Sequence, residues 1–362
     1  MTDDSDLLDP SRRRGRGAAS NRPGRFERHE RPPEHDGWDI EEEALPALRT
    51  EVREETARRI IARNTSPDIG FDRSVNPYRG CEHGCIYCFA RPSHGYLGLS
   101  AGLDFETRLT ARPNAAPQLR KELSSKRYVP APLAIGTNTD PYQPVERERR
   151  IMRSVLEVLR DFNHPVTIAT KGTLVERDAD ILGPMGQAGL ARVGISITSL
   201  DAGLSRRLEP RVPAPARRLA AIERLARAGV PVRVMVSPVI PGLTDHEVES
   251  ILAAARDAGA AAASWIMLRL PHEVAPLFRD WLAEHAPLRR ERVMARLREM
   301  HGGKDYSAEW HHRMRGEGVH ARMIACRFDV AARRHGLDAD LPSLRTDLFA
   351  VPPQPGDQLT LF

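Results

Sequence analysis

Cysteine, lysine and long apolar segments are all scarce in this sequence of 362 residues. Four cysteines, three of them clustered, do not make the disulfide framework of a small secreted domain. Residues 1–10 are acidic and no long apolar run follows, so we expect no signal peptide and no membrane span, and a cytoplasmic protein in a reducing compartment. Lysine occurs only at positions 121, 126, 171 and 304, so the net charge of +5 rests almost entirely on arginine. That charge permits a nucleic-acid partner, although codon bias explains it equally well.

The cysteines that are present fall mainly in one short segment. Cys81, Cys85 and Cys88 have the spacing C-x-x-x-C-x-x-C. Three thiolates on one tight loop can hold a cube-shaped iron–sulfur cluster and leave its fourth iron without a protein ligand. An open coordination position is where a metal centre performs chemistry. The alternative is a structural zinc ion whose fourth ligand is His83 or His94.

The spacing, with Tyr87 directly before the last cysteine, resembles the signature of radical S-adenosylmethionine (SAM) enzymes. The resemblance implies a [4Fe–4S] cluster on Cys81, Cys85 and Cys88, with SAM bound at the open iron. An external one-electron donor would reduce the cluster, and reductive cleavage of SAM would form a 5′-deoxyadenosyl radical that abstracts a hydrogen atom from the substrate. It also implies that Tyr87 lies beside the adenine of SAM.

Residues 66–285 alternate between short apolar segments and amphipathic segments, which predicts an α/β fold with a parallel sheet. We expect helices at 149–162, 216–228 and 245–258, and strands at 74–76, 132–136, 166–169, 193–197, 232–236 and 264–268. Six such units are too few for an eight-stranded barrel. They match the partial (β/α)6 barrel of TIM type that the resemblance implies, with the cysteine loop after the first strand.

We expect four regions along the chain. Residues 1–45 are rich in Arg, Pro and Gly and predict a disordered tail, either a solvating segment or an arginine arm for phosphates. Residues 46–285 form the radical SAM core, which begins with a helix or an extended segment at 46–65. Residues 286–345 predict a basic helical extension that either packs over the open side of the barrel or binds nucleic acid. Residues 346–362 predict a flexible tail.

Polar residues follow the predicted strands, where the active residues of a barrel lie. Asn138 and Asp140 come after the second strand, and the resemblance implies contact with the amino end of SAM, although an Asp-Pro turn capping the next helix explains the same residues. Lys171 follows the third strand, and its compact ammonium suits the carboxylate of SAM. Ser196 lies on the fourth strand and is a further candidate SAM contact.

Further strings at 208–211, 238–245 and 268–271 resemble the proteins similar to spore photoproduct lyase, often described as DNA-repair-photolyase-like. This resemblance implies DNA repair or modification. Spore photoproduct lyase uses an additional cysteine near its substrate, whereas here only Cys326 remains, in a predicted helix where we expect a small buried side chain. The lyase activity itself is therefore not expected. Alternatives are a radical SAM enzyme acting on RNA, a peptide or a small molecule, and a non-catalytic protein that binds nucleic acid with a cluster or zinc.

The end of the sequence carries an independent motif. A proline-rich spacer at 352–357 precedes Gln358, Leu359, Leu361 and Phe362. Apolar residues at the tip of such a tail are typical of a linear motif that fills a pocket on a partner. The string resembles the peptide by which bacterial DNA-metabolism proteins bind the replication sliding clamp. A chance match, or a tail that folds back on its own domain, is the alternative.

Overall fold

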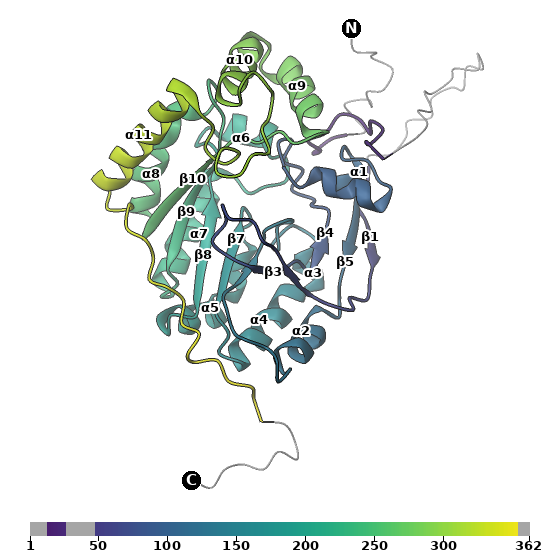
Figure 1. Ribbon diagram of the computed structural model, residues 1–362, viewed down its shortest axis with the longest axis vertical. Coiled ribbons are helices and arrows are strands. Elements are labelled where there is room, and N and C mark those ends of the chain that lie inside the picture. The colour runs from purple at the N-terminus through teal and green to yellow at the C-terminus, as the bar shows by residue number, and fades with distance from the viewer. Residues whose placement is uncertain (1–12, 27–47, 354–362) are drawn as a thin grey trace, which may run out of the picture.

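Six parallel strands form the centre of the computed structural model, which describes residues 13–26 and 48–353 (Figure 1). The large sheet has the order β10-β9-β8-β7-β6-β3-β2, in which only the β2–β3 pair is antiparallel. Its strands are β2 (Ile61–Arg63), β3 (Arg73–Val75), β6 (Leu133–Ile135), β7 (Val166–Thr170), β8 (Ala191–Ser196), β9 (Val232–Val239) and β10 (Ala262–Met267). All six strands predicted from the sequence are present, and the α/β fold is confirmed.

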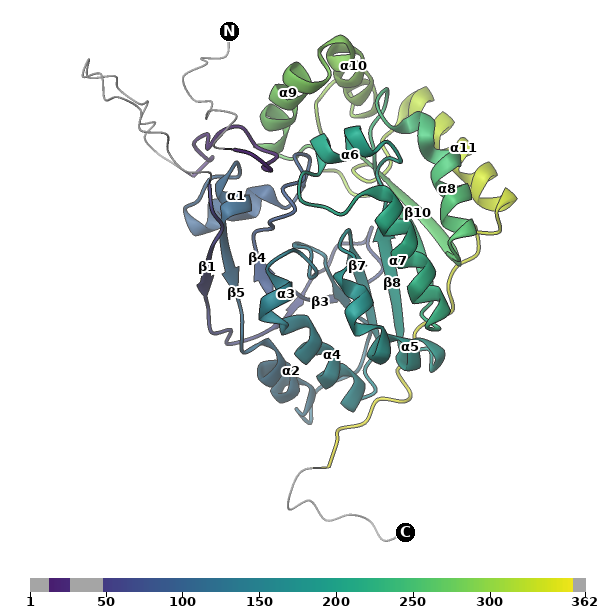
Figure 2. The same cartoon turned by 180° about the vertical axis from the view of Figure 1, so that it is seen from behind.

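Helices between consecutive strands cover one face of this sheet (Figure 2). They are α3 (Glu146–Arg149), α4 (Ile151–Asp161), α5 (Ala179–Gln187), α7 (Pro215–Arg227) and α8 (Val248–Asp257), with 3-10 turns η3 (Leu174–Asp178) and η4 (Asp245–Glu247). The buried apolar residues of α4, α5, α7 and α8 and those of the strands form one continuous core. The short helix α6 (Ala202–Leu208) lies beyond the end of β8, and its Leu204 and Leu208 join a second apolar cluster with Ile86 of the cysteine loop. The helices predicted at 149–162, 216–228 and 245–258 are thus confirmed. Sequential strands joined by helices produce the parallel order, as expected for a partial barrel.

A small second sheet stands beside the barrel and has the order β1-β5-β4. It consists of β1 (Glu51–Glu54), β4 (Tyr78–Arg79) and β5 (Arg108–Ala111), and is accompanied by η2 (Arg91–Leu97), α1 (Asp104–Thr107) and α2 (Ala115–Leu123). Within the segment expected at 46–65, the described residues 48–65 approach the core through the two short strands β1 and β2, which selects the extended interpretation over the helical one. The connection between β4 and η2 carries the three clustered cysteines.

The basic extension is helical and packs against the barrel. Residues 286–345 contain η5 (Pro287–Arg289), α10 (Arg290–Met300) and α11 (Gly318–Arg334), and they follow α9 (Val274–His285), which lies at the end of the expected core region. Ile324 and Phe328 of α11 join the main core, where the ring of Phe328 lies 6.0 Å from that of Trp265 on β10. Cys326 on the same helix is exposed, so the expectation that it is buried was wrong. Its neighbours Ile324 and Phe328 take the inward face instead.

A contact between two loops connects the two open edges of the partial barrel, which are β2 and β10. The segment before α11 pairs with the edge strand β10, because the amide of Met267 donates to the carbonyl of Met314 at 2.9 Å. Arg313 of this segment binds Asp68, in the loop between β2 and β3, through two contacts of 2.5 and 2.6 Å, and donates to Ser66 at 3.1 Å. Since β2 and β10 are the opposite edges of the sheet, this ion pair bridges the side of the barrel that has no further strands.

Residues 13–26 are packed, contrary to the expectation of disorder throughout 1–45. Gly17 and Ala18 each donate a backbone N–H to the buried carboxylate of Glu106, both at 2.9 Å. A Cβ atom at Gly17 would lie 1.9 Å from the carbonyl oxygen of Gly84, between two of the clustered cysteines. The segment therefore lies directly on the cysteine loop, beside α1 in Figure 1. The rest of the expected tail, 1–12 and 27–45, lies outside the described residues.

The start of the expected flexible tail, 346–362, is packed against the core. The ring of Phe349 packs against Tyr128, Phe162 and His164 at centroid distances of 5.6 to 6.1 Å. The backbone N–H of Ala350 donates to the carbonyl of Phe162 at 3.1 Å. The proposed clamp-binding residues 358–362 lie outside the described residues. Within residues 13–26 and 48–353, no helix is long and apolar enough to cross a membrane.

The buried ring of His164 predicts a loss of stability in mild acid. Burial lowers the pKa of His164 to about 4, from an ordinary value of 6.5. As the pH falls, His164 is therefore protonated in the unfolded state before it is protonated in the folded state. The contribution of neutral His164 to the free energy of unfolding is complete above pH 6.5 and is lost as the pH falls toward 4. The shift corresponds to about 3 kcal/mol when fully expressed.

Urea denaturation at pH 7 and pH 4.5 measures this effect. We expect wild type to lose about 2 to 3 kcal/mol more than His164→Gln does between these two pH values. The exposed His272, replaced by glutamine, is the control and should leave the wild-type pH dependence intact. Equal losses in wild type and His164→Gln would show that His164 is not the titrating group.

Candidate metal and cofactor site

The three clustered cysteines lie on a tightly wound loop after β4. Cys81 and Cys85 are 6% and 7% exposed, and Cys88 is half-buried. The loop is anchored at its start, where the N–H of Cys81 donates to the carbonyl of Phe105 at 2.9 Å. Two turns follow, closed by hydrogen bonds from Gly84 to Cys81 and from Cys88 to Cys85. These turns place all three thiols on one short stretch of backbone.

One buried arginine holds this loop together from within. The guanidinium of Arg91 is fully buried and donates to the carbonyls of Cys85 and Gly84 at 3.0 and 3.2 Å, and to those of Ala101 and Gly102. Its remaining partner is the fully buried carboxylate of Glu106, at 2.6 Å. Because Glu106 also accepts the backbone N–H groups of the 13–26 segment, a single ion pair ties that segment, the cysteine loop and α1 together.

The segment after β6 holds the loop from the other side. The side-chain amide of Gln143 donates to the carbonyl of Gly80 at 3.2 Å and accepts from the N–H of Glu82 at 2.8 Å, so it spans Cys81. Asp140 lies 3.2 Å from Nδ1 of His83. The Asp140-Pro-Tyr-Gln143 segment therefore positions the cysteine loop.

Asp140 also fixes the end of β7. Its carboxylate accepts from the hydroxyl of Thr170 at 2.6 Å and from the N–H of Lys171 at 2.7 Å. Burial alone would raise the pKa of Asp140, but His83 and these hydrogen bonds outweigh it, and the pKa lies below its ordinary value. Asp140 is thus ionised and saturated by protein partners, which assigns it at least a positioning role.

Lys171 reaches across the carboxyl ends of the neighbouring strands. Its ammonium donates to the hydroxyl of Ser196 on β8 at 2.6 Å and to the carbonyl of Ser237 on β9 at 2.9 Å. It also lies 3.2 Å from the carboxylate of Glu209 and 5.6 Å from the ring centroid of Tyr87. The positive charge is therefore held at the point where β7, β8, β9 and the cysteine loop meet.

Glu209 is the buried anion of this group. Besides Lys171, it binds Arg218 at 2.7 Å, accepts from Thr198 at 2.8 Å and accepts from the hydroxyl of Tyr87. Burial alone would raise the pKa of Glu209, but the charges of Arg218 and Lys171 outweigh it, and the pKa is far below its ordinary value. A carboxylate bound by four protein donors is held in one position, so it orients both Tyr87 and Lys171.

The structure brings together four of the five candidate SAM contacts. Tyr87, Lys171 and Ser196 form one connected cluster, and Asp140 joins it through the backbone of Lys171. Asn138 is held separately, by a hydrogen bond of 3.3 Å from its backbone N–H to the side chain of Asn76. Within the described residues, no hydrogen bond joins the Asn138 side chain to Lys171.

The donor set fits an iron–sulfur cluster. Burial raises the pKa of Cys81 and Cys85, so thiolates there require compensating positive charge from bound metal and from cations nearby. The histidines that a zinc site would need are engaged elsewhere, since His94 binds the carbonyl of Arg108 at 3.0 Å and His83 faces Asp140. Among the described residues, no three His, Cys, Asp or Glu side chains converge on one ion. A cluster does not need such convergence, because its irons take one thiolate each.

Four charged residues of this site were not predicted from the sequence: Arg91, Glu106, Glu209 and Arg218. They form two ion pairs whose side chains are fully buried, one beneath the cysteine loop and one beneath Lys171. The only sequence signal for Glu209 is the string at 208–211, which resembles proteins similar to spore photoproduct lyase but assigns no role to this residue. Nothing in the local pattern distinguishes Arg91 from the many other arginines.

Comparison with known proteins agrees with this geometry. A family model described as the radical SAM superfamily matches residues 75–255. The chain is 36% identical over 259 residues to the uncharacterized protein Rv2578c of Mycobacterium tuberculosis, covering 71% of this chain and 75% of that protein. It is 25% identical over 173 residues to the uncharacterized protein MJ0683 of Methanocaldococcus jannaschii, covering 48% of this chain and 62% of that one.

Among solved structures, the fold resembles that of a tyrosine-to-phenylalanine mutant of spore photoproduct lyase. The TM-score is 0.54 at 14% identity, with 78% of this chain and 79% of that chain covered. This likeness concerns the fold, and it agrees with the partial barrel described above. The range matched by the family model, residues 75–255, spans the three clustered cysteines, Lys171 and Ser196. The chain belongs to the radical SAM superfamily, and it is a radical SAM enzyme.

Proposed function

We propose that this enzyme acts on DNA, in repair or modification, and that Cys81, Cys85 and Cys88 hold a [4Fe–4S] cluster. The observation that carries the DNA assignment is an aromatic platform beside the cysteine loop. Phe89 directly follows Cys88 and is 45% exposed. The guanidinium of Arg269, after β10, lies 4.6 Å from the centroid of its ring. An exposed ring paired with a guanidinium stacks well on a nucleobase.

The position of this platform matches the needs of the chemistry. Enzymes that act on a base take it out of the stack and hold it against aromatic or apolar side chains. Phe89 is adjacent in sequence to a residue of the proposed cluster, so a base stacked on it would lie beside the reactive centre. Arg269 also has a buried Nε atom without a hydrogen-bond partner, so its guanidinium is not fully bound by the protein.

The residues around the site have distinct tasks. When bound, the cluster supplies the electron with which SAM is cleaved to methionine and a 5′-deoxyadenosyl radical. Lys171, held in place by Ser196, would pair with the carboxylate of SAM, and Tyr87 would lie beside its adenine. Asp140 holds the end of β7 and the cysteine loop, and Asn138 would contact the amino group of SAM. The buried surroundings exclude water.

The exposed position of Cys326 is relevant to which DNA reaction is proposed. Spore photoproduct lyase uses a thiol near its substrate to return a hydrogen atom to the repaired base, whereas Cys326 is exposed on α11 and, within the described residues, has no hydrogen bond to any member of the connected cluster around Lys171. We therefore do not extend the proposal to the activity of spore photoproduct lyase. The proposed partners are DNA, an external one-electron donor and, through residues 358–362, the replication sliding clamp.

Anaerobic reconstitution tests the cofactor assignment. Wild-type protein reduced with dithionite should bind about four irons and release 5′-deoxyadenosine from SAM. Cys85→Ala should lose at least 90% of both the iron and the product. Cys326→Ala, the matched control, should retain both. Zinc in place of iron, or undiminished product from Cys85→Ala, would contradict the assignment.

Binding of a fluorescent single-stranded oligonucleotide tests the DNA assignment. Phe89→Ala should weaken binding about tenfold, since a stacked base contributes about 1–3 kcal/mol. The control is Tyr96→Ala, which removes another exposed aromatic ring, one that packs on Phe26. Equal effects of the two substitutions, or tighter binding of RNA than of DNA of the same sequence, would contradict the proposal.

A further inference from the structure

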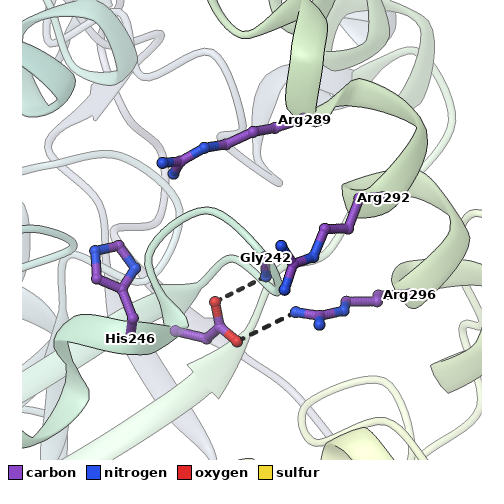
Figure 3. A pocket seen from close by; sticks show the side chains of 6 residues that line it. Gly242, His246, Arg289, Arg292 and Arg296 are labelled. Atoms are coloured by element: carbon purple, nitrogen blue, oxygen red, sulfur yellow. Dashed lines mark hydrogen bonds and ion pairs between the residues drawn. The ribbon is translucent and has the colours of Figure 1, made fainter.

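A cavity lies at the carboxyl end of β9, and its lining includes no residue of the cysteine loop. It has a volume of about 270 Å³ and lies between the loop that follows β9 and the start of α10 (Figure 3). We call it the arginine pocket, and its lining residues are Gly242, Asp245, His246, Arg289, Arg292 and Arg296. None of these residues contacts the proposed cluster or SAM residues, so the pocket requires a separate explanation.

Three guanidinium groups converge on this pocket. Arg289 is the N-cap of α10, and Arg292 and Arg296 follow on the helix at spacings of three and four residues, so the three share one side. Figure 3 shows their side chains extending toward the loop that carries Gly242 and His246. Like charges at this spacing repel one another, so the arrangement is unfavourable unless a negative charge lies between them.

The protein supplies only part of that negative charge. Asp245 lies 3.6 Å from Arg296, and its other oxygen accepts the N–H of Gly242 at 2.8 Å. Within residues 13–26 and 48–353, the guanidinium groups of Arg289 and Arg292 have neither an ion-pair nor a hydrogen-bond partner. Three cations facing one carboxylate leave an excess of two positive charges in the pocket.

The loop beside the arginines turns at a glycine. Gly242 has a φ of +77°, a conformation that residues with a side chain rarely adopt. A Cβ atom there would make only ordinary contacts with Arg296 and Arg292, at 3.4 and 3.6 Å, so the loop already lies against these arginines. Planar guanidinium groups with several free donors are the preferred partners of phosphate oxygens, which they bind in pairs.

We propose that the arginine pocket binds a backbone phosphate of the DNA substrate. This inference rests on the proposed function and names a contact that holds the strand away from the reacting base. The pocket lies at the carboxyl end of β9, the same end at which Ser237 binds Lys171. A strand with one base at Phe89 would thus be held at the same end of the barrel by a phosphate contact that reads no sequence.

The salt dependence of DNA binding tests this inference in the full-length, cluster-loaded protein. Removing one phosphate interaction reduces the slope of log K against log[salt] by about 0.7 on single-stranded DNA. We expect the double variant Arg289→Ala/Arg292→Ala to bind a 12-nucleotide single strand at least fivefold more weakly at 0.1 M salt. Its slope should be smaller by about 0.7 to 1.4. SAM cleavage without DNA should be unchanged.

Arg322→Ala/Arg333→Ala is the matched control, because it removes the same charge from the outer surface of α11 and should keep the wild-type slope. Identical slopes for the pocket variant and wild type would overturn the inference and leave the DNA function standing. No DNA binding by wild type would overturn both. Titration with inorganic phosphate identifies the other source of this ligand: binding of phosphate that the pocket variant loses, without any change in DNA affinity, would also overturn it.

Discussion

Replacing Arg91 by methionine should lower the free energy of unfolding by about 3–5 kcal/mol, because it leaves the buried carboxylate of Glu106 without its cation. The same change removes hydrogen bonds to four backbone carbonyls, two of them in the cysteine loop. A buried carbonyl without a donor costs about 1–3 kcal/mol, so the loop should move away from the arrangement that brings the three thiols together. We therefore expect the variant to bind less than a third of the wild-type iron.

Urea denaturation of the metal-free protein measures the stability change, and iron content after reconstitution measures the effect on the loop. Arg120→Met is the control, since Arg120 pairs with Asp161 at the surface and such pairs contribute about 0–1 kcal/mol. The double variant Arg91→Met/Glu106→Gln should recover part of the stability, because it no longer leaves a buried charge unpaired. A loss below about 1 kcal/mol in Arg91→Met would refute the assigned role of this ion pair.

The strands and the polar residues at their ends could be predicted because their signals are local. Short apolar segments alternate with amphipathic ones, and this alternation places Lys171 and Ser196 at the ends of neighbouring strands. Parallel strands end at the same edge of a sheet, so residues far apart in sequence meet there. The hydrogen bond of 2.6 Å from the ammonium of Lys171 to the hydroxyl of Ser196 follows from this rule.

The supporting ion pairs could not be predicted, because their signal is not local. Arg91 and Glu106 are 15 residues apart in the sequence, and Lys171 and Glu209 are 38 residues apart. In an arginine-rich chain, composition does not distinguish a fully buried guanidinium from a solvated one. The packing of residues 13–26 was missed for the same reason, since this polar and glycine-rich segment is ordered by partners such as Glu106 rather than by a core of its own.

Glu209→Gln should have a second large effect, at the strand ends where SAM is proposed to bind. The substitution keeps the shape of the side chain but removes the charge that faces Arg218 and Lys171. Leaving buried cations without their anion should lower the free energy of unfolding by about 3–5 kcal/mol near pH 7. Because the pKa of Glu209 is held below its ordinary value of 4.5, the wild-type contribution is complete above that pH and is lost as the pH falls below it.

Glu247→Gln is the matched control, because Glu247 accepts from the hydroxyl of Ser199 and the N–H of Leu200, and the substitution leaves no buried cation behind. We expect it to cost about 1 kcal/mol or less. Adding Arg218→Met to Glu209→Gln should restore part of the lost stability, since one unpaired cation is removed with the anion. If Glu209→Gln were no more costly than Glu247→Gln, the carboxylate would not be the counter-charge that holds Lys171 and Arg218. Lys171 would then have to be positioned by Ser196 and the carbonyl of Ser237 alone.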